Sequence, residues 1–126
     1  MSVMGLGTDI VEIARIEALS LRYGSRLAQR LLSPHEWNYY QQCRQPIRFL
    51  ARRFAVKEAA AKALGIGIRQ GIAFCDFEIQ NNALGKPCLV LHRRAAEVAR
   101  QHGVTRHWVS IADERRYAIA TVLLEC

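Results

Sequence analysis

The segment from Pro46 to Gly65, PIRFLARRFAVKEAAAKALG, constrains the fold more than any other part of the sequence. Alanine, leucine, lysine, arginine and glutamate dominate it, and these residue types favour helix. Proline suits the first position of a helix, whereas glycine suits the position just after its end. The sequence therefore predicts one long helix over Pro46–Leu64 that ends at Gly65.

This helix lies in the most basic part of the chain. The 126 residues carry 18 Lys and Arg against 11 Asp and Glu, a formal net charge of +7, and residues 44–69 hold a single acid, Glu58, among their basic side chains. Such a block is either a solvated face or a site for a polyanion: nucleic acid, an acidic protein or a phosphorylated small molecule. Most of the basic residues are arginines, which bind phosphate with paired hydrogen bonds, although an arginine-rich codon composition also explains them.

Glu58 occupies an unexpected place on this helix. On a helical wheel at about 100° per residue it falls in the middle of an apolar arc. Burying a carboxylate costs on the order of several kcal/mol unless a cation compensates it. Lys62, one turn later, is one candidate cation, and a bound metal ion is the other. Both remain open from the helix alone; the arc consists of Ile47, Leu50, Ala51, Phe54, Ala61 and Gly65.

Asp9 poses the same question in the apolar stretch Val3–Ile13, which is typical of a strand. Aspartate is depleted from strands and from cores. Either Gly7, Thr8 and Asp9 form a turn, a bulge or a cap, or Asp9 serves a site.

Two misplaced carboxylates, Asp9 from a strand and Glu58 from a helix, are what a magnesium site needs. Mg²⁺ takes oxygen ligands, commonly one or two carboxylates together with phosphate oxygens and water. Basic side chains and a glycine-rich loop nearby make a phosphate ester a suitable ligand; these are Arg53, Lys57, Lys62 and the loop Gly65–Gly71.

The remaining pattern predicts one α+β domain over residues 1–126. Separate helices and antiparallel-looking strands follow one another without repeats or linkers. The predicted helices are Ala14–Leu32 with a break near Gly24, a helix from Ser33 to about Cys43, and Arg93–His102; the further predicted strands are Ala73–Gln80, Pro87–Leu91, His107–Asp113 and Tyr117–Glu125.

The chain shows no targeting signal. Its start, MSVMGLGTDIVEI, lacks the basic residues and cleavage site of a signal peptide, and no run approaches the ~18 apolar residues of a membrane span. We therefore expect a cytoplasmic location and no membrane partner. The widely spaced cysteines predict free thiols rather than disulfides or a zinc site; they are Cys43, Cys75, Cys88 and Cys126.

Two blocks of the sequence resemble a known family. They are Gly5–Ile13, GLGTDIVEI, followed by Arg15, and Arg53–Gly65, RFAVKEAAAKALG. They resemble the AcpS-type holo-[acyl-carrier-protein] synthases, the small 4′-phosphopantetheinyl transferases, and the resemblance covers essentially the whole chain. It implies an α+β fold with antiparallel strands packed against helices, assembled as a homotrimer with an active site at each subunit interface.

The resemblance also implies the reaction. Such enzymes transfer the 4′-phosphopantetheine arm of coenzyme A to a serine of apo-acyl carrier protein and release adenosine 3′,5′-bisphosphate, in support of fatty acid biosynthesis. The implied cofactor is Mg²⁺, held by the carboxylates that match Asp9 and Glu58 and by the pyrophosphate of coenzyme A. Lys62 matches a catalytic lysine that contacts the phosphates. The proton of the serine hydroxyl goes to Glu58 or to a water on the metal, and the sequence does not choose between them.

Further residues match binding positions of the family. The implied coenzyme A contacts are Arg53, Lys62, Gly65, Lys86 and Pro87. Arginines of the first helix match a surface that docks the acidic carrier protein, although a solvated face also explains them; they are Arg15, Arg22 and Arg26.

One position departs from the family pattern. Many relatives have a histidine before Val-Ser or Val-Thr on the penultimate strand, and here Trp108 stands there. His107 lies one residue earlier and would face the other side of a strand. Some relatives also carry a histidine at the position of Asp113. No catalytic histidine is therefore carried over.

An RNA-binding module is the competing interpretation, because it would also be basic and α+β. Aromatic residues make up only 8% of the chain, and no RNA-recognition motif is evident. It also leaves Asp9 and Glu58 unexplained. We therefore expect no nucleic-acid partner.

Overall fold

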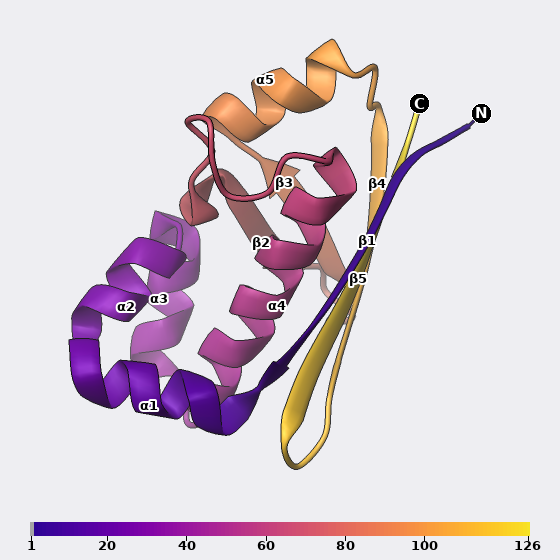
Figure 1. The fold of residues 1–126 in the computed structure, drawn as a ribbon. Coiled ribbons are helices and arrows are strands. Elements are labelled where there is room, and N and C mark those ends of the chain that lie inside the picture. Colours follow the sequence, from indigo (N-terminus) through magenta and orange to yellow (C-terminus); the bar gives the residue numbers. More distant parts are fainter. Residues whose placement is uncertain (1) are drawn as a thin grey trace.

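A three-stranded antiparallel sheet forms one side of the molecule, and every helix lies on the same side of it (Figure 1). The computed structural model describes residues 2–126. The strand order is β1 (Val3–Glu12), β5 (Tyr117–Glu125) and β4 (Arg106–Asp113). The fold is therefore α+β, as the sequence predicts. Among the described residues, no helix is long and apolar enough to cross a membrane.

The long helix α4 (Pro46–Leu64) packs across β1 and β5, and the other elements surround it (Figure 1). Gly65 ends α4 with φ 86°, a left-handed conformation that glycine adopts without strain. The other elements are α1 (Ile13–Tyr23), α2 (Ser25–Leu31), α3 (Pro34–Gln42), the short 3₁₀ helix η1 (Phe74–Asp76), the hairpin β2 (Phe77–Asn81) and β3 (Pro87–Leu91), and α5 (Arg93–Gln101).

The wheel prediction for α4 is wrong in one respect. The helix is buried around most of its circumference, because strands cover one side and α1–α3 and β2 cover others. Its C-terminal half keeps one open stripe, formed by Phe54, Glu58 and Lys62. Glu58 thus lies on the open stripe rather than in the middle of a buried arc, and the fully buried charged residue is its neighbour Lys57.

Two glycines allow β1 to press against α4. A Cβ atom at Gly5 would lie 2.0 Å from the carbonyl oxygen of Ala63, and one at Gly7 would lie 2.0 Å from that of Ala59. Because side chains alternate along a strand, Asp9 faces the same side as these glycines. The close approach therefore places Asp9 beside the open stripe of α4. Asp9 is paired regularly with Ala120 in the ladder, so it is not in a turn or a bulge.

Two further predictions need correction. The strand expected over Ala73–Gln80 begins only at Phe77, because the buried Asp76 side chain accepts a hydrogen bond from the Ala73 amide and closes a turn. Arg26 lies on α2, beyond the break at Gly24, rather than on the first helix.

The outer face of the sheet carries apolar side chains open to solvent. Because no helix covers this face, its outward-pointing positions are exposed; they include Leu6 (66%), Ile10 (61%), Trp108 (43%) and Ile119 (42%). An exposed apolar area of this kind is typical of an interaction site.

Candidate active site

Asp9 and Lys62 join β1 to α4. The Lys62 ammonium donates hydrogen bonds to Asp9 Oδ1 at 2.9 Å and to the carbonyl oxygen of Thr8 at 3.0 Å. The expected Glu58–Lys62 pair is not formed: within residues 2–126, Lys62 pairs with Asp9 and Glu58 has no ion pair. Lys62 is half-exposed, so its charge also faces solvent.

Glu58 lies in the electrostatic field of Asp9. Its pKa is raised above the ordinary value, first because burial disfavours the charged carboxylate and second because Asp9 is negatively charged. Lys62 and Arg15 oppose this shift but do not cancel it. The structure therefore brings together two carboxylates, and the charge of Asp9 disfavours ionisation of Glu58, an arrangement typical of functional sites.

The residues present fit a magnesium ion. Two carboxylates converge from β1 and α4, and residues 2–126 contain no group of three or more His, Cys, Asp and Glu that would form a closed metal cage. Mg²⁺ is commonly held by one or two carboxylates with the remaining positions filled by phosphate and water. Asp9 and Glu58 could hold such an ion, and its charge would relieve their repulsion.

A shallow hollow continues this site past the end of α4. Lys62 and Gly65 line it together with Ile66, Gly67 and Arg69, around a volume of about 410 Å³. The Arg69 guanidinium donates a hydrogen bond to the Ile66 carbonyl oxygen at 2.7 Å, which fixes the loop after the helix. Two sequence-predicted contacts, Lys62 and Gly65, thus share one hollow beside Asp9 and Glu58.

Arg53 lies elsewhere. Nine residues separate it from Lys62, which is two and a half turns at 3.6 residues per turn, so the two side chains leave opposite sides of α4. Arg53 lines a larger pocket of about 590 Å³ between α3, α4, the β2–β3 hairpin and β4, and Pro87 lines the same pocket. The predicted coenzyme A contacts therefore divide between two places on one subunit.

Lys86 points away from that pocket. Its ammonium lies 5.5 Å from the centre of the Trp108 ring. The Arg106 guanidinium lies 5.2 Å from the centre of the same ring, and the indole nitrogen donates a hydrogen bond to Glu125 Oε1 at 2.6 Å. Trp108 is exposed, whereas His107 is half-buried and burial lowers its pKa. Because neighbouring residues of a strand face opposite sides, His107 does not stand in for the histidine that Trp108 replaces.

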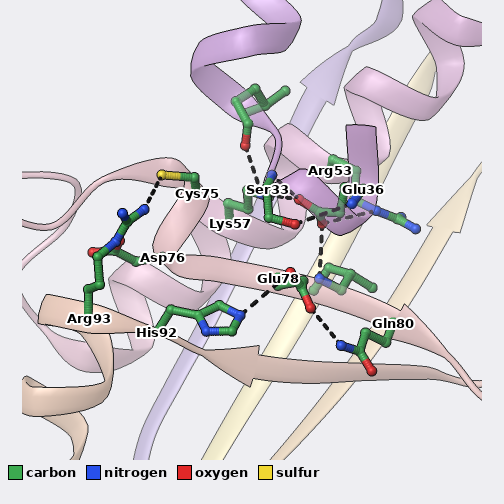
Figure 2. A network of polar contacts seen from close by, with 12 residues as sticks. Ser33, Glu36, Arg53, Lys57, Cys75, Asp76, Glu78, Gln80, His92 and Arg93 are labelled. Atoms are coloured by element: carbon green, nitrogen blue, oxygen red, sulfur yellow. Dashed lines mark hydrogen bonds and ion pairs between the residues drawn. The ribbon is translucent and has the colours of Figure 1, made fainter. Parts of the chain in front are cut away.

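Lys57 does not belong to the phosphate-facing cations that the sequence suggests. It is fully buried, and its ammonium lies 2.5 Å from Glu36 Oε1 and donates to the Leu31 carbonyl oxygen at 2.7 Å (Figure 2). Burial lowers the pKa of Lys57, and the Glu36 carboxylate opposes that shift. Glu36 itself completes a capping box with Ser33 at the start of α3.

The arginines predicted to dock the carrier protein lie along α1 and α2. Arg15 stands over the Phe54 ring at 5.8 Å and is close enough to Glu58 to oppose the rise in the pKa of that carboxyl, so it borders the carboxylate site. Arg22 stands over the Tyr23 ring at 5.3 Å. Arg26 lines a hollow between the two helices with Arg30. Arg15 thus lies beside the carboxylate site, and Arg22 and Arg26 lie farther along α1 and α2.

Comparison with known proteins identifies the family. The family model of the 4′-phosphopantetheinyl transferase superfamily matches residues 5–122. The chain belongs to this superfamily. It is 66% identical over 125 residues to the holo-[acyl-carrier-protein] synthase of Yersinia enterocolitica, covering 99% of both chains. It is therefore an enzyme, a transferase of the holo-[acyl-carrier-protein] synthase type.

Solved structures of this family share the fold. The holo-[acyl-carrier-protein] synthase of Neisseria meningitidis superposes with a TM-score of 0.94 at 38% identity, over 99% of this chain and 100% of that one. The Helicobacter pylori enzyme in complex with coenzyme A gives 0.83 at 32% identity, over 95% of this chain and 99% of that one. The arrangement of strands and helices described above is thus that of holo-[acyl-carrier-protein] synthases.

Two features of the structure were not predicted from the sequence. Gly5 and Gly7 bring β1, the strand that carries Asp9, against α4, and the spacing of two residues between these glycines and Asp9 was a signal for it. The buried pair of Glu36 and Lys57 gave no signal, because the two residues lie on different helices and each has an ordinary local explanation.

Proposed function

We propose that this enzyme transfers the 4′-phosphopantetheine arm of coenzyme A to a serine of apo-acyl carrier protein, with Mg²⁺ as cofactor, and releases adenosine 3′,5′-bisphosphate. The single observation that carries the proposal is the convergence of Asp9, Glu58 and Lys62 at the contact of β1 and α4. Two carboxylates and one ammonium suit a metal-bound diphosphate better than they suit RNA, which would meet two negative charges there.

The residues have separate tasks in this reaction. The serine oxygen attacks the β-phosphorus of coenzyme A, and the bond from that phosphorus to the bridging oxygen breaks, so the negative charge develops on the departing phosphate. Lys62 stabilises that charge through its half-exposed ammonium. Glu58 is the one of the two carboxylates that has no ion pair among residues 2–126, so it is available to accept the serine proton. Asp9 and Glu58 would hold Mg²⁺, and the ion would supply charge compensation to the diphosphate.

The division of the binding residues supports a site shared between subunits. Lys62 and Gly65 lie beside the edge strand β1, whereas Arg53 and Pro87 line a pocket that β4, the other edge strand, also borders. One coenzyme A reaches both groups if the hollow of one subunit faces the pocket of the next. The open apolar face of the sheet supplies a surface on which a homotrimer can form.

The arginines beside the site suit an acidic protein substrate. Arg15, Arg22 and Arg26 extend away from Glu58 along α1 and α2, so a carrier docked there presents its serine to the carboxylate site. Opposed charges of this kind mainly set the encounter rate and the register of the two proteins. We assign the reaction to cytoplasmic fatty acid biosynthesis.

A mass measurement tests the proposal. Apo-acyl carrier protein is incubated with the enzyme, coenzyme A and Mg²⁺ and then weighed by mass spectrometry. The proposal predicts the gain of one phosphopantetheine per carrier. An unchanged carrier, together with salt-dependent binding of RNA, would favour the nucleic-acid module instead.

A further inference from the structure

Lys57 and Glu36 form a buried ion pair that the transfer reaction does not use directly. Both side chains are at most 1% exposed, and their charged atoms lie 2.5 Å apart. Glu36 also accepts hydrogen bonds from the Ser33 amide at 3.0 Å and the Ile79 amide at 2.9 Å (Figure 2). The carboxylate thus ties α3, α4 and β2 together.

Arg53 is the second cation on the same carboxylate. Its Nε atom lies 3.5 Å from Glu36 Oε2, its guanidinium stands over the Phe49 ring at 4.5 Å, and Nη2 donates to Asn81 Oδ1 at 3.5 Å. These are long contacts compared with that of Lys57. Lys57 therefore holds Glu36 closely, whereas Arg53 lies at the edge of the cluster.

Arg53 has capacity for a further partner. Its side chain is more than nine-tenths buried, and its Nε atom is buried without a hydrogen bond among the described residues. Arg53 lines the pocket of about 590 Å³, where Arg52, His35 and Asp113 are also found, and Asp113 is paired with Arg48 and Arg52. A buried guanidinium at the wall of a pocket suits an anion, because arginine binds phosphate with paired donors.

The charges of the cluster explain what Lys57 does. Lys57 and Arg53 carry two positive charges against the single negative charge of Glu36. Because the closer cation already compensates Glu36, the charge of Arg53 is left for a ligand. Without Lys57, Glu36 and Arg53 would form a neutral pair, and the pocket would lose its attraction for an anion.

We propose that Lys57 is a positioning residue, which neutralises Glu36 and thereby keeps the Arg53 guanidinium available to a phosphate group in the pocket. The identity of that phosphate as part of coenzyme A rests on the proposed function. The availability of Arg53 to an anion does not, because it follows from the geometry of the cluster.

Four variants test this role through binding of adenosine 3′,5′-bisphosphate, measured by calorimetry on the enzyme. Lys57→Met removes the ammonium but keeps the length of the side chain, and we expect the Kd to rise about tenfold or more, since a lost charged contact has this size. Lys57→Met with Glu36→Gln removes both buried charges, and we expect the Kd to return to within about threefold of wild type. Arg53→Gln shows how much affinity is lost when the guanidinium itself is absent. Adding Lys57→Met to Arg53→Gln should have no further effect on the Kd.

A merely structural Lys57 gives a different pattern. The variant with both Lys57→Met and Glu36→Gln would then bind the bisphosphate as weakly as Lys57→Met or more weakly. Lys57→Met would also raise the Kd as much in the Arg53→Gln background as in wild type. Either result overturns the proposal. If Lys57→Met alone does not fold, as judged by circular dichroism, the double variant decides by itself: binding close to wild type supports the proposal and weak binding overturns it. Arg100→Met, which removes an exposed basic residue on α5 outside this pocket, is the control and should bind as wild type.

The same experiment separates the two proposals. If wild-type enzyme transfers phosphopantetheine and the Lys57→Met variant binds the bisphosphate normally, the proposed function stands and the role of Lys57 is overturned. A wild-type enzyme that binds the bisphosphate with the predicted pattern but transfers nothing supports the role of Lys57 and overturns the function. A wild-type enzyme that binds neither the bisphosphate nor inorganic pyrophosphate, a simpler anion, overturns both proposals.

Discussion

Lys62 Nζ lies 2.9 Å from Asp9 Oδ1, so the ammonium of the central helix is paired with the edge strand rather than with Glu58 on its own helix. This pairing leaves Glu58 uncompensated by a direct partner and close to a second carboxylate. Two carboxylates thus share the site with two cations, Lys62 and Arg15, within a strongly basic protein. The proposed Mg²⁺ would add positive charge beside the unpaired Glu58.

Glu58→Gln should abolish transfer and stabilise the fold at neutral pH. Because the pKa of Glu58 is raised in the folded protein, the native state binds this proton more tightly than the unfolded chain does. Ionisation therefore lowers the free energy of unfolding as the pH rises from the unfolded pKa through the folded one, and Gln does not ionise. We expect the Tm difference, variant minus wild type, to be larger at pH 8 than at pH 4. A Tm difference that does not change with pH would contradict this assignment.

Asp9→Asn should also abolish transfer at little cost in stability. Its ion pair with the half-exposed Lys62 is worth about 0–1 kcal/mol, as is usual for surface pairs. Transfer assays and urea unfolding measure the two effects. Glu97→Gln is the matched control, because Glu97 is an exposed carboxylate paired with Arg94 at 2.6 Å on α5. Equal losses of activity in both variants would contradict a specific role of Asp9.

Gly7→Ala should weaken both fold and activity. The added Cβ would lie 2.0 Å from the Ala59 carbonyl oxygen, a backbone atom that no side-chain rearrangement can move. Strand and helix must therefore separate, at a cost of about 1–3 kcal/mol or more, and Asp9 moves away from Glu58. Urea unfolding measures the cost. A variant as stable and active as wild type would show that the close approach of β1 to α4 is unnecessary.

Ile119→Asp should dissociate the proposed trimer. Ile119 lies on the central strand of the sheet with its side chain on the open face, and a carboxylate there cannot be buried cheaply between subunits. Light scattering should report monomers with a retained circular dichroism spectrum and little transfer. Leu21→Asp, on the exposed side of α1, should remain a trimer. Fully active Ile119→Asp monomers would exclude a shared active site.

Arg22→Glu should raise the KM for the carrier protein and leave the KM for coenzyme A unchanged. A reversed charge at a docking surface slows encounter, by about five- to tenfold at low salt, and the effect should shrink as salt screens it. Arg100→Glu on α5 makes the same change in net charge away from this surface. An equal rise of both KM values would show that Arg22 does not act through docking.

Most of the fold could be predicted from local sequence signals. Pro46 and Gly65 mark the ends of α4, and Ser33 marks the start of α3. These signals are local because each depends on neighbours within one turn. The strand predicted from Ala73 begins only at Phe77, because the Asp76 side chain bonds to the Ala73 amide.

The site itself was only partly predictable. Asp9 and Glu58 are recognisable as carboxylates in apolar surroundings, and the family resemblance assigns them a role. The wheel could not show that α4 is covered on most sides, because the covering elements come from distant parts of the chain. The burial of Lys57 could not be predicted for the same reason. Its partner Glu36 lies 21 residues earlier, and no local pattern links the two.

The dependence of transfer on Mg²⁺ shows whether Asp9 and Glu58 hold a metal ion. The rate at which wild-type enzyme adds phosphopantetheine to apo-acyl carrier protein is measured by mass spectrometry, first in excess EDTA and then as Mg²⁺ is added back. If Asp9 and Glu58 hold the ion, transfer is absent in EDTA, rises to saturation with Mg²⁺, and fails to recover in Glu58→Gln at the same concentrations. Transfer at the full rate in EDTA, or a Glu58→Gln enzyme that saturates like wild type, would contradict the account.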